Sequence, residues 1–231
     1  MIDAVKIFLG ALVLSFSALA NVAAADGAAM LKDDCAACHN LVGPAPVTLK
    51  AMWGRKGPDL FYAGNKYKEA WLVQWLQKPT RIRPAGMFYA NHVKPGAKAD
   101  EVDAATLTVH PVLGESDAKA VAGELMKRTA RGDLIKQGDY QTGSIALSMG
   151  EMLFDKFRGC LACHEIEAGY GGRSGPELYT AAQRLQEDWL VSFLRNPQAW
   201  DPKTFMPNKH LSDTDVQKLV HYLRALGAEK K

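Results

Sequence analysis

The sequence predicts an all-α protein built from two small helical domains in tandem, and three observations support this fold class. Segments 118 positions apart repeat one another: "GRKGPDL" at 54–60 matches "GRSGPEL" at 172–178, and "WLVQWLQKP" at 71–79 matches "WLVSFLRNP" at 189–197. In the second pair the apolar residues fall at i, i+1, i+4 and i+5, which is one face of a helix. Alternating strand patterns are scarce. An internal duplication of this kind indicates two homologous domains.

The first 25 residues differ from the rest of the chain. Lys6 precedes the apolar stretch "IFLGALVLSFSALANVAAA", which ends in small residues. This order is typical of a secretory signal peptide, with cleavage expected after Ala25. The alternative is an uncleaved anchor, because a membrane-spanning helix needs about 20 apolar residues. Either reading predicts export, to the periplasm of a bacterium.

The remaining chain divides into a first domain at 26–131, a linker at 132–147 and a second domain at 148–231. In both domains a proline, Pro79 or Pro197, is expected to end the helix before it. Near the C-terminus Ser212 is a predicted N-cap and Asp215 its capping-box partner, at the start of "LSDTDVQKLVHYLRAL". Domains of this size bury little apolar core of their own, so we expect another group to fill the middle of each.

The first domain carries an insertion, residues 88–113, about twenty residues longer than its counterpart in the second domain. Loops of this length without evident structure are often functional, and this one either covers a site, contacts a partner or is a neutral extension. The net charge of the chain is +3 and no compact run of Lys and Arg stands out, which argues against nucleic-acid binding.

The pentapeptide "CxxCH" occurs twice, as "CAACH" at 35–39 and "CLACH" at 160–164. Three chemistries use such cysteines: half a zinc site, a redox dithiol, or a covalent haem anchor. Zinc needs four ligands, and a thioredoxin-type dithiol needs a βαβ context that is not visible here. A haem anchor fits both copies, because cysteines at i and i+3 can form two thioethers and the following histidine can ligate iron. The predicted attachment residues and iron ligands are Cys35, Cys38 and His39 in the first copy and Cys160, Cys163 and His164 in the second.

With these motifs the chain resembles the dihaem class I cytochromes c, most clearly through "FRGCLACHEI", "GPELY" and "FMPNKHLSDTDVQKLVHYLRAL". The resemblance implies that Pro58 and Pro176 accept a hydrogen bond from the proximal histidine, which would fix the ring and strengthen it as a ligand. Arg55 and Arg173 occupy matching places and are candidates to pair with haem propionates.

The family's sixth iron ligand is a methionine in a later loop, and the resemblance assigns this role to Met206 in the second domain. Met87 lies at nearly the same place in the first domain, although no proline follows it. His92 is the rival ligand there.

Two haems that each hold a histidine and a methionine have no open position for a substrate. The resemblance therefore predicts a protein with two covalently attached haems that carries single electrons between redox partner proteins, either free or as the haem subunit of a larger oxidoreductase. The alternative is a dihaem enzyme of the thiosulfate dehydrogenase or peroxidase type. That alternative gains if the insertion displaces Met87 and leaves His92 or water on one iron.

Overall fold

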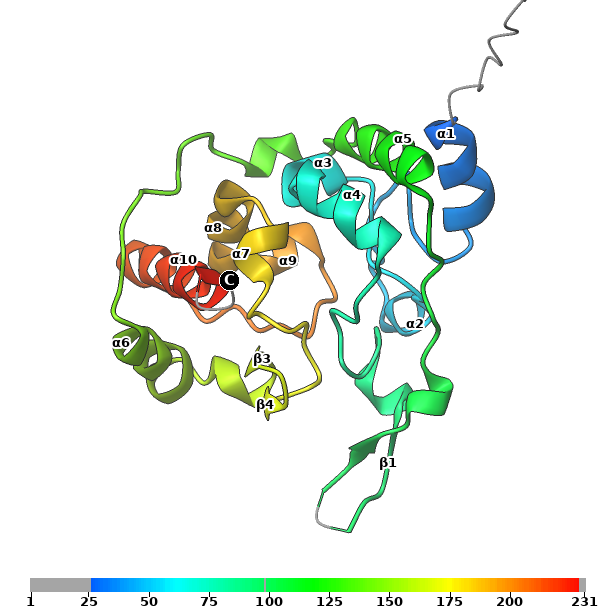
Figure 1. Ribbon diagram of the computed structural model, residues 1–231. Helices are drawn as coiled ribbons and strands as arrows, with labels where there is room; N and C mark the ends of the chain where they lie inside the picture. Colours follow the sequence, from blue (N-terminus) through cyan, green and yellow to red (C-terminus); the bar gives the residue numbers. More distant parts are fainter. Residues whose placement is uncertain (1–25, 98, 229–231) are drawn as a thin grey trace, which may run out of the picture.

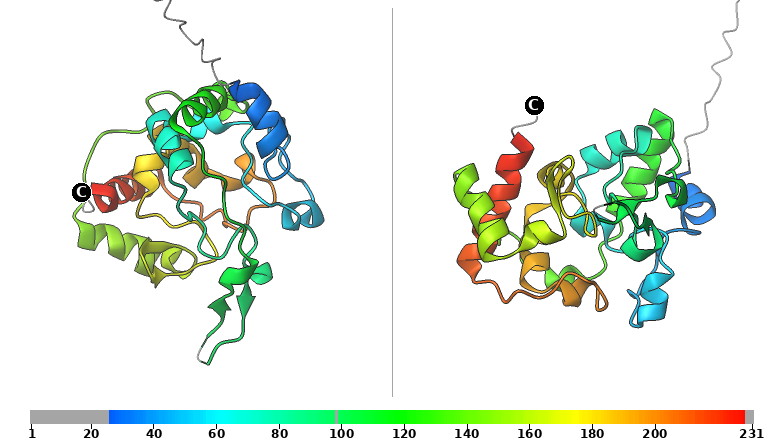
Figure 2. Two further views of the ribbon diagram at one scale, coloured as in Figure 1. Left: turned by 45° about the vertical axis from the view of Figure 1, so that its right-hand side comes forward. Right: turned by 90° about the horizontal axis from the view of Figure 1, so that it is seen from below.

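The computed structural model describes residues 26–97 and 99–228, and helices dominate it (Figure 1). We call residues 26–131 the first half and residues 148–228 the second half. The two halves lie side by side, with the blue α1 and the red α10 at opposite ends of the molecule in both views of Figure 2. No helix among the described residues is long and apolar enough to cross a membrane. The predicted signal peptide, residues 1–25, lies outside the described residues.

The helices of the first half begin at the first described residue. Asp26 caps α1 (Gly27–Met30) by accepting hydrogen bonds from the N–H groups of Ala28 and Ala29, each at 3.1 Å. Outside the insertion, the remaining helical elements of this half are the π-helical turn Leu31–Cys35, α2 (Leu49–Trp53), α3 (Ala63–Lys66), α4 (Glu69–Gln77) and α5 (Glu115–Met126).

The second half also begins with a helix that continues into a π-helical turn and ends with a long helix, and it contains a small hairpin. Its elements are α6 (Leu147–Met152), the π-helical turn Leu153–Phe157, the 3₁₀ turn Cys160–Ala162, β3 (Glu165–Glu167), β4 (Tyr170–Gly171), α7 (Ala181–Arg184), α8 (Glu187–Arg195), α9 (Pro197–Trp200) and α10 (Asp213–Ala228). β3 and β4 pair antiparallel. Both ends of α7 and of α8 lie 118 positions after the ends of α3 and of α4.

In each half the first helix crosses the last one at a glycine. A Cβ on Gly27 would lie 2.3 Å from the carbonyl oxygen of Ala120 in α5, and a Cβ on Gly150 would lie 2.3 Å from the ring of Tyr222 in α10. A side chain at either glycine would push the two helices apart.

The insertion at 88–113 is an ordered hairpin rather than a loop without structure. β1 (Val93–Lys94) pairs antiparallel with β2 (Glu101–Val102), and the hairpin projects from the body of the molecule in Figure 1. Two 3₁₀ turns, Tyr89–Asn91 and Ala104–Thr106, flank it. Asp103 closes its base by donating a backbone hydrogen bond to the carbonyl of His92 at 2.8 Å.

The two halves meet through hydrogen bonds that repeat under the 118-residue shift. The N–H of Lys68 donates to the carbonyl of Arg184 at 3.0 Å, and the N–H of Gln186 donates to the carbonyl of Lys66 at 2.9 Å. Under this shift Lys68 corresponds to Gln186, and Lys66 corresponds to Arg184. Equivalent segments of the two halves therefore pair with each other, as they do around a local twofold axis.

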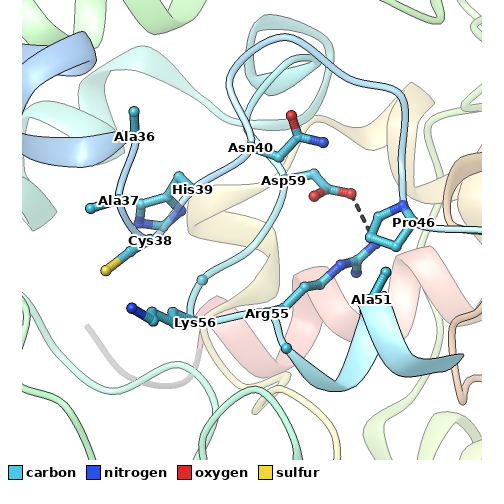
Figure 3. Close-up of a pocket in the computed structure, with 12 residues that line it drawn as sticks. Ala36, Ala37, Cys38, His39, Asn40, Pro46, Ala51, Arg55, Lys56 and Asp59 are labelled. Atoms are coloured by element: carbon cyan, nitrogen blue, oxygen red, sulfur yellow. Dashed lines mark hydrogen bonds and ion pairs between the residues drawn. The ribbon is translucent and has the colours of Figure 1, made fainter. Parts of the chain in front are cut away.

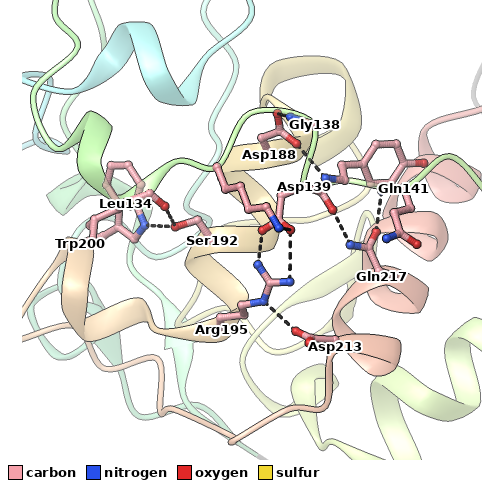
Figure 4. A network of polar contacts seen from close by, with 12 residues as sticks. Leu134, Gly138, Asp139, Gln141, Asp188, Ser192, Arg195, Trp200, Asp213 and Gln217 are labelled. Carbon is pink, nitrogen blue, oxygen red and sulfur yellow. Dashed lines mark hydrogen bonds and ion pairs between the residues drawn. The ribbon is translucent and has the colours of Figure 1, made fainter.

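The segment that connects the halves is held against the second half. Asp188 in α8 accepts hydrogen bonds from the N–H groups of Gly138 and Tyr140, both at 2.8 Å. Arg195 in α8 pairs with Asp139 and with Asp213 of α10 (Figure 4). The predicted linker is therefore bonded to the domain that follows it.

Candidate functional site

Each pentapeptide forms a turn at the end of the first helical segment of its half, and this turn brings the backbone of the histidine back to the first cysteine. The N–H of His39 donates to the carbonyl of Cys35 at 3.0 Å, and the N–H of His164 donates to the carbonyl of Cys160 at 3.2 Å. All four cysteine thiols are free of disulfide bonds. Cys35 and Cys160 are half-buried, whereas the second cysteine of each copy is exposed.

Both histidines make the same side-chain hydrogen bond. Nδ1 of His39 lies 2.8 Å from the carbonyl oxygen of Pro58, and Nδ1 of His164 lies 2.7 Å from that of Pro176. A carbonyl accepts, so Nδ1 carries the proton and Nε2 has the free lone pair. This is the hydrogen bond that the resemblance predicts, and it orients each ring as a ligand through Nε2.

A glycine lies directly against each ring. A Cβ on Gly57 would lie 2.5 Å from Cε1 of His39, and a Cβ on Gly175 would lie 2.6 Å from Cε1 of His164. No side chain fits in either place without displacing the ring. This explains the glycine before each "PDL" or "PEL" segment.

Burial keeps both histidines neutral at pH 7. It lowers the pKa of His164 to about 4 and lowers the pKa of His39 as well. A neutral imidazole is the form that binds a metal.

The cysteines do not resemble the activated thiols of a redox dithiol. Burial raises the pKa of Cys35 and of Cys160, so both are protonated thiols at neutral pH, whereas a reactive dithiol has a lowered pKa. Within residues 26–97 and 99–228 no three side chains of the His, Cys, Asp or Glu type come together as a metal site, which leaves a zinc site without its ligands.

A cavity of about 290 Å³ opens beside the first pentapeptide. Figure 3 shows Cys38 and His39 on one side of it and Arg55, bonded to Asp59, on the other. In the second half the indole N–H of Trp189 is buried and has no acceptor within the described residues. Arg55 likewise has a buried Nε without an acceptor. Buried donors of this kind call for an acceptor from a bound group.

These observations fit haem. Cys35 and Cys38, and equally Cys160 and Cys163, would form the thioethers, and the free Nε2 of the histidine would bind iron. The unpaired Nε of Arg55, which lines the cavity, matches the carboxylates that haem carries on its edge. Both sites have the same histidine, proline and glycine arrangement.

The two predicted propionate partners already have carboxylate neighbours. Arg55 binds Asp201 of the other half at 2.7 Å and Asp59 at 3.0 Å, and it thereby links the halves. Arg173, about half exposed, donates from Nε to Glu165 at 3.0 Å. Their role toward propionates stays a prediction.

A different arginine, which sequence reasoning missed, reaches across to the second site. Arg83 belongs to the first half, yet its charge helps to lower the pKa of His164. Its neighbour Ile82 accepts a 2.7 Å hydrogen bond from the N–H of Glu177, which docks this segment on the loop after Pro176. No carboxylate within the described residues forms an ion pair with Arg83, and Glu177 pairs with Arg184.

The structure places the candidate sixth ligands in loops. Met206 is half-buried, and its backbone is fixed on both sides: its carbonyl accepts from Gln198 Nε2 at 2.9 Å and its N–H donates to Thr204 Oγ1 at 3.3 Å. Met87 is also half-buried, at the start of the hairpin insertion. Their iron ligation stays a prediction.

The residue that lies against His39 is a histidine absent from the sequence prediction. His110, at the end of the insertion, has its ring centroid 6.3 Å from that of His39. The signal in the sequence is "HP" at 110–111, which precedes the last helix of the first half as "MP" at 206–207 precedes the last helix of the second.

Comparison with curated proteins and with solved structures gave no significant match to this chain. A comparison with family models did give one. Residues 147–227 match the cytochrome c family, and this match implies covalently bound haem c and electron transfer for the segment.

Proposed function

We propose that the chain is an exported c-type cytochrome with two covalently bound haems, which carries single electrons between redox partner proteins. The observation that supports two haems is the equivalence of the two histidine sites. His39 has the same proline carbonyl on Nδ1 and the same glycine against its ring as His164, which lies in the cytochrome c domain.

When bound, haem supplies an iron that takes up and releases one electron at a time. The residues of the chain hold and orient the haems. Pro58 and Pro176 hold the proximal rings in the tautomer that offers Nε2, and the four cysteines fix the group covalently. Arg83, with no ion-pair partner in the described residues, is available to bind a propionate at the second site from the first half.

Export is the part of the proposal that rests on residues 1–25. Covalent attachment of two haems would use all four cysteines and leave none for a disulfide, and cleavage after Ala25 would release the protein into the periplasm. Retention of this segment would tether it to the membrane. Either form is accessible to a partner protein or to the other subunits of an oxidoreductase.

Haem counting tests the proposal. The full chain, expressed with a bacterial cytochrome c maturation system, should carry two haems that survive denaturing electrophoresis. The double variants C35A/C38A and C160A/C163A should each carry one. A parent chain with one haem, or with none, would refute the two-haem function.

A further inference from the structure

We infer that His110 is the sixth iron ligand of the first half, in place of Met87 or His92. The inference rests on the proposed function, because it requires haem bound at Cys35 and Cys38. It replaces the histidine and methionine pair that the sequence predicts for this site with a pair of histidines.

The distance between the two rings carries the inference. The centroids of His39 and His110 lie 6.3 Å apart, with an angle of 60° between the ring planes. Imidazole nitrogen binds a first-row metal at about 2 Å, so two imidazoles on opposite sides of one metal have their centroids about 6 Å apart. The two rings are therefore separated by the space that one metal ion and its two bonds occupy.

The protonation of His110 matches that of His39. Nδ1 of His110 lies 2.8 Å from the carbonyl oxygen of its neighbour Pro111, so Nδ1 carries the proton and Nε2 keeps its lone pair. Both rings thus donate through Nδ1 to a proline carbonyl and offer Nε2 to a metal. Metal-binding histidines in proteins show this arrangement in general.

The chain around His110 is held against α4 and the loop that follows it. The N–H of Leu113 donates to the carbonyl of Leu76 at 3.0 Å, and Arg81 donates to the carbonyl of Thr108 at 3.2 Å. Trp75 packs edge-on against the His110 ring, with centroids 4.5 Å apart. The segment after the insertion is therefore held in place although the hairpin before it projects from the body.

The order of residues before the last helix agrees with this geometry. His110–Pro111 lies just ahead of α5, which begins at Glu115, and Met206–Pro207 lies just ahead of α10, which begins at Asp213. Met87 has Phe88 after it and is separated from α5 by the whole insertion. Counted back from the last helix of each half, His110 therefore corresponds to Met206 more closely than Met87 does.

His92 has a structural role at the base of the hairpin. Its Nδ1 lies 2.9 Å from Oγ1 of Thr106, and its ring lies over Gly86, where a Cβ would come within 2.5 Å of Cδ2. Gly86 has a positive φ of 71°, which also favours glycine there. These contacts keep the His92 ring within the insertion.

Absorption and carbon monoxide binding of the full-length dihaem protein test the inference. The methionine-to-iron charge-transfer band of the oxidised parent should correspond to one methionine ligand per two haems. H110M should double its amplitude per chain. Reduced H110A should bind carbon monoxide at one haem and regain the parent spectrum on addition of imidazole, while the parent binds none.

M87A and H92A are the matched controls, and both should leave the band amplitude and the closed state unchanged. A loss of half the band in M87A, or carbon monoxide binding in H92A but not in H110A, would overturn the inference. If H110A does not accumulate, the parent band and M87A still decide between methionine and histidine. Haem content is measured first on each sample, so a chain with fewer than two haems refutes the proposed function and not this ligand.

Discussion

Removal of Arg55 is expected to weaken the contact between the two halves strongly and in a pH-dependent way. The guanidinium of Arg55 holds Asp59 of its own half and Asp201 of the other, at 3.0 and 2.7 Å. The three side chains are 12 %, 2 % and 15 % exposed. Loss of one partner from a buried ion pair costs about 3–5 kcal/mol, because the remaining charge stays buried without compensation. We therefore expect the R55M variant to lose about that free energy of unfolding at neutral pH.

The pH dependence separates this electrostatic cause from lost packing. Burial already raises the pKa of Asp59 although Arg55 opposes it, so without Arg55 the pKa in the folded state rises further above the unfolded value of about 3.9. A raised carboxyl pKa destabilises the folded state above that pKa, and the penalty disappears as the pH falls through it. The free energy of unfolding that R55M loses should thus reach its full value near about pH 8 and be much smaller near about pH 4.5.

Urea unfolding of the haem-loaded proteins at the two pH values gives these free energies. K119A is the control, because Lys119 and Glu115 form a pair on the surface, with side chains 62 % and 68 % exposed, that contributes little to stability. The reasoning fails if R55M loses less than about 1 kcal/mol, or loses the same amount at both pH values.

Two further substitutions test the site and the interface. In G175A the new Cβ would come within 2.6 Å of the His164 ring and should displace it. We expect this variant to lose about 1–3 kcal/mol of its free energy of unfolding and to show a shifted haem absorption. The control G123A, with open space around its Cβ, should show neither effect. Q186A removes the side-chain amide that donates to the carbonyls of Gly64 and Tyr67. It should lower the free energy of unfolding by about 1–3 kcal/mol and speed up amide exchange at the contact between the halves. Unchanged amide exchange there would contradict this prediction.

Local sequence signals predicted the regular parts of the fold well. The prolines end their helices as expected, since α4 ends at Gln77, ahead of Pro79, and α8 ends at Arg195, ahead of Pro197. Ser212 accepts the hydrogen bond of an N-cap from the N–H of Asp215 at 3.1 Å. The carboxylate of Asp215 pairs with Arg158 rather than closing a capping box. Signals that act within one helical turn are visible in the sequence because their partners are neighbours.

The parts that were not predicted depend on residues far apart in the chain. Arg55 was expected to face haem, and nothing near it in sequence reveals Asp201 as its partner. The sequence predicts Met87, in the loop after α4, as the sixth ligand of the first half. The ligand proposed here lies beyond the insertion, which lengthens the chain between α4 and the last helix. His110 is found by counting back from α5 instead.

The different ligands proposed for the two haems predict a direction for electron flow. Methionine sulfur raises the potential of haem iron relative to a second imidazole, so the first half, with His39 and His110, should hold the haem of lower potential. The hydrogen bonds between the halves fix the two sites relative to each other, and an electron would run from the first to the second. A redox titration should show two one-electron steps, of which H110M raises the lower and M206H lowers the upper. Two equal potentials in the parent, or a shift of the upper step in H110M, would rule out this order.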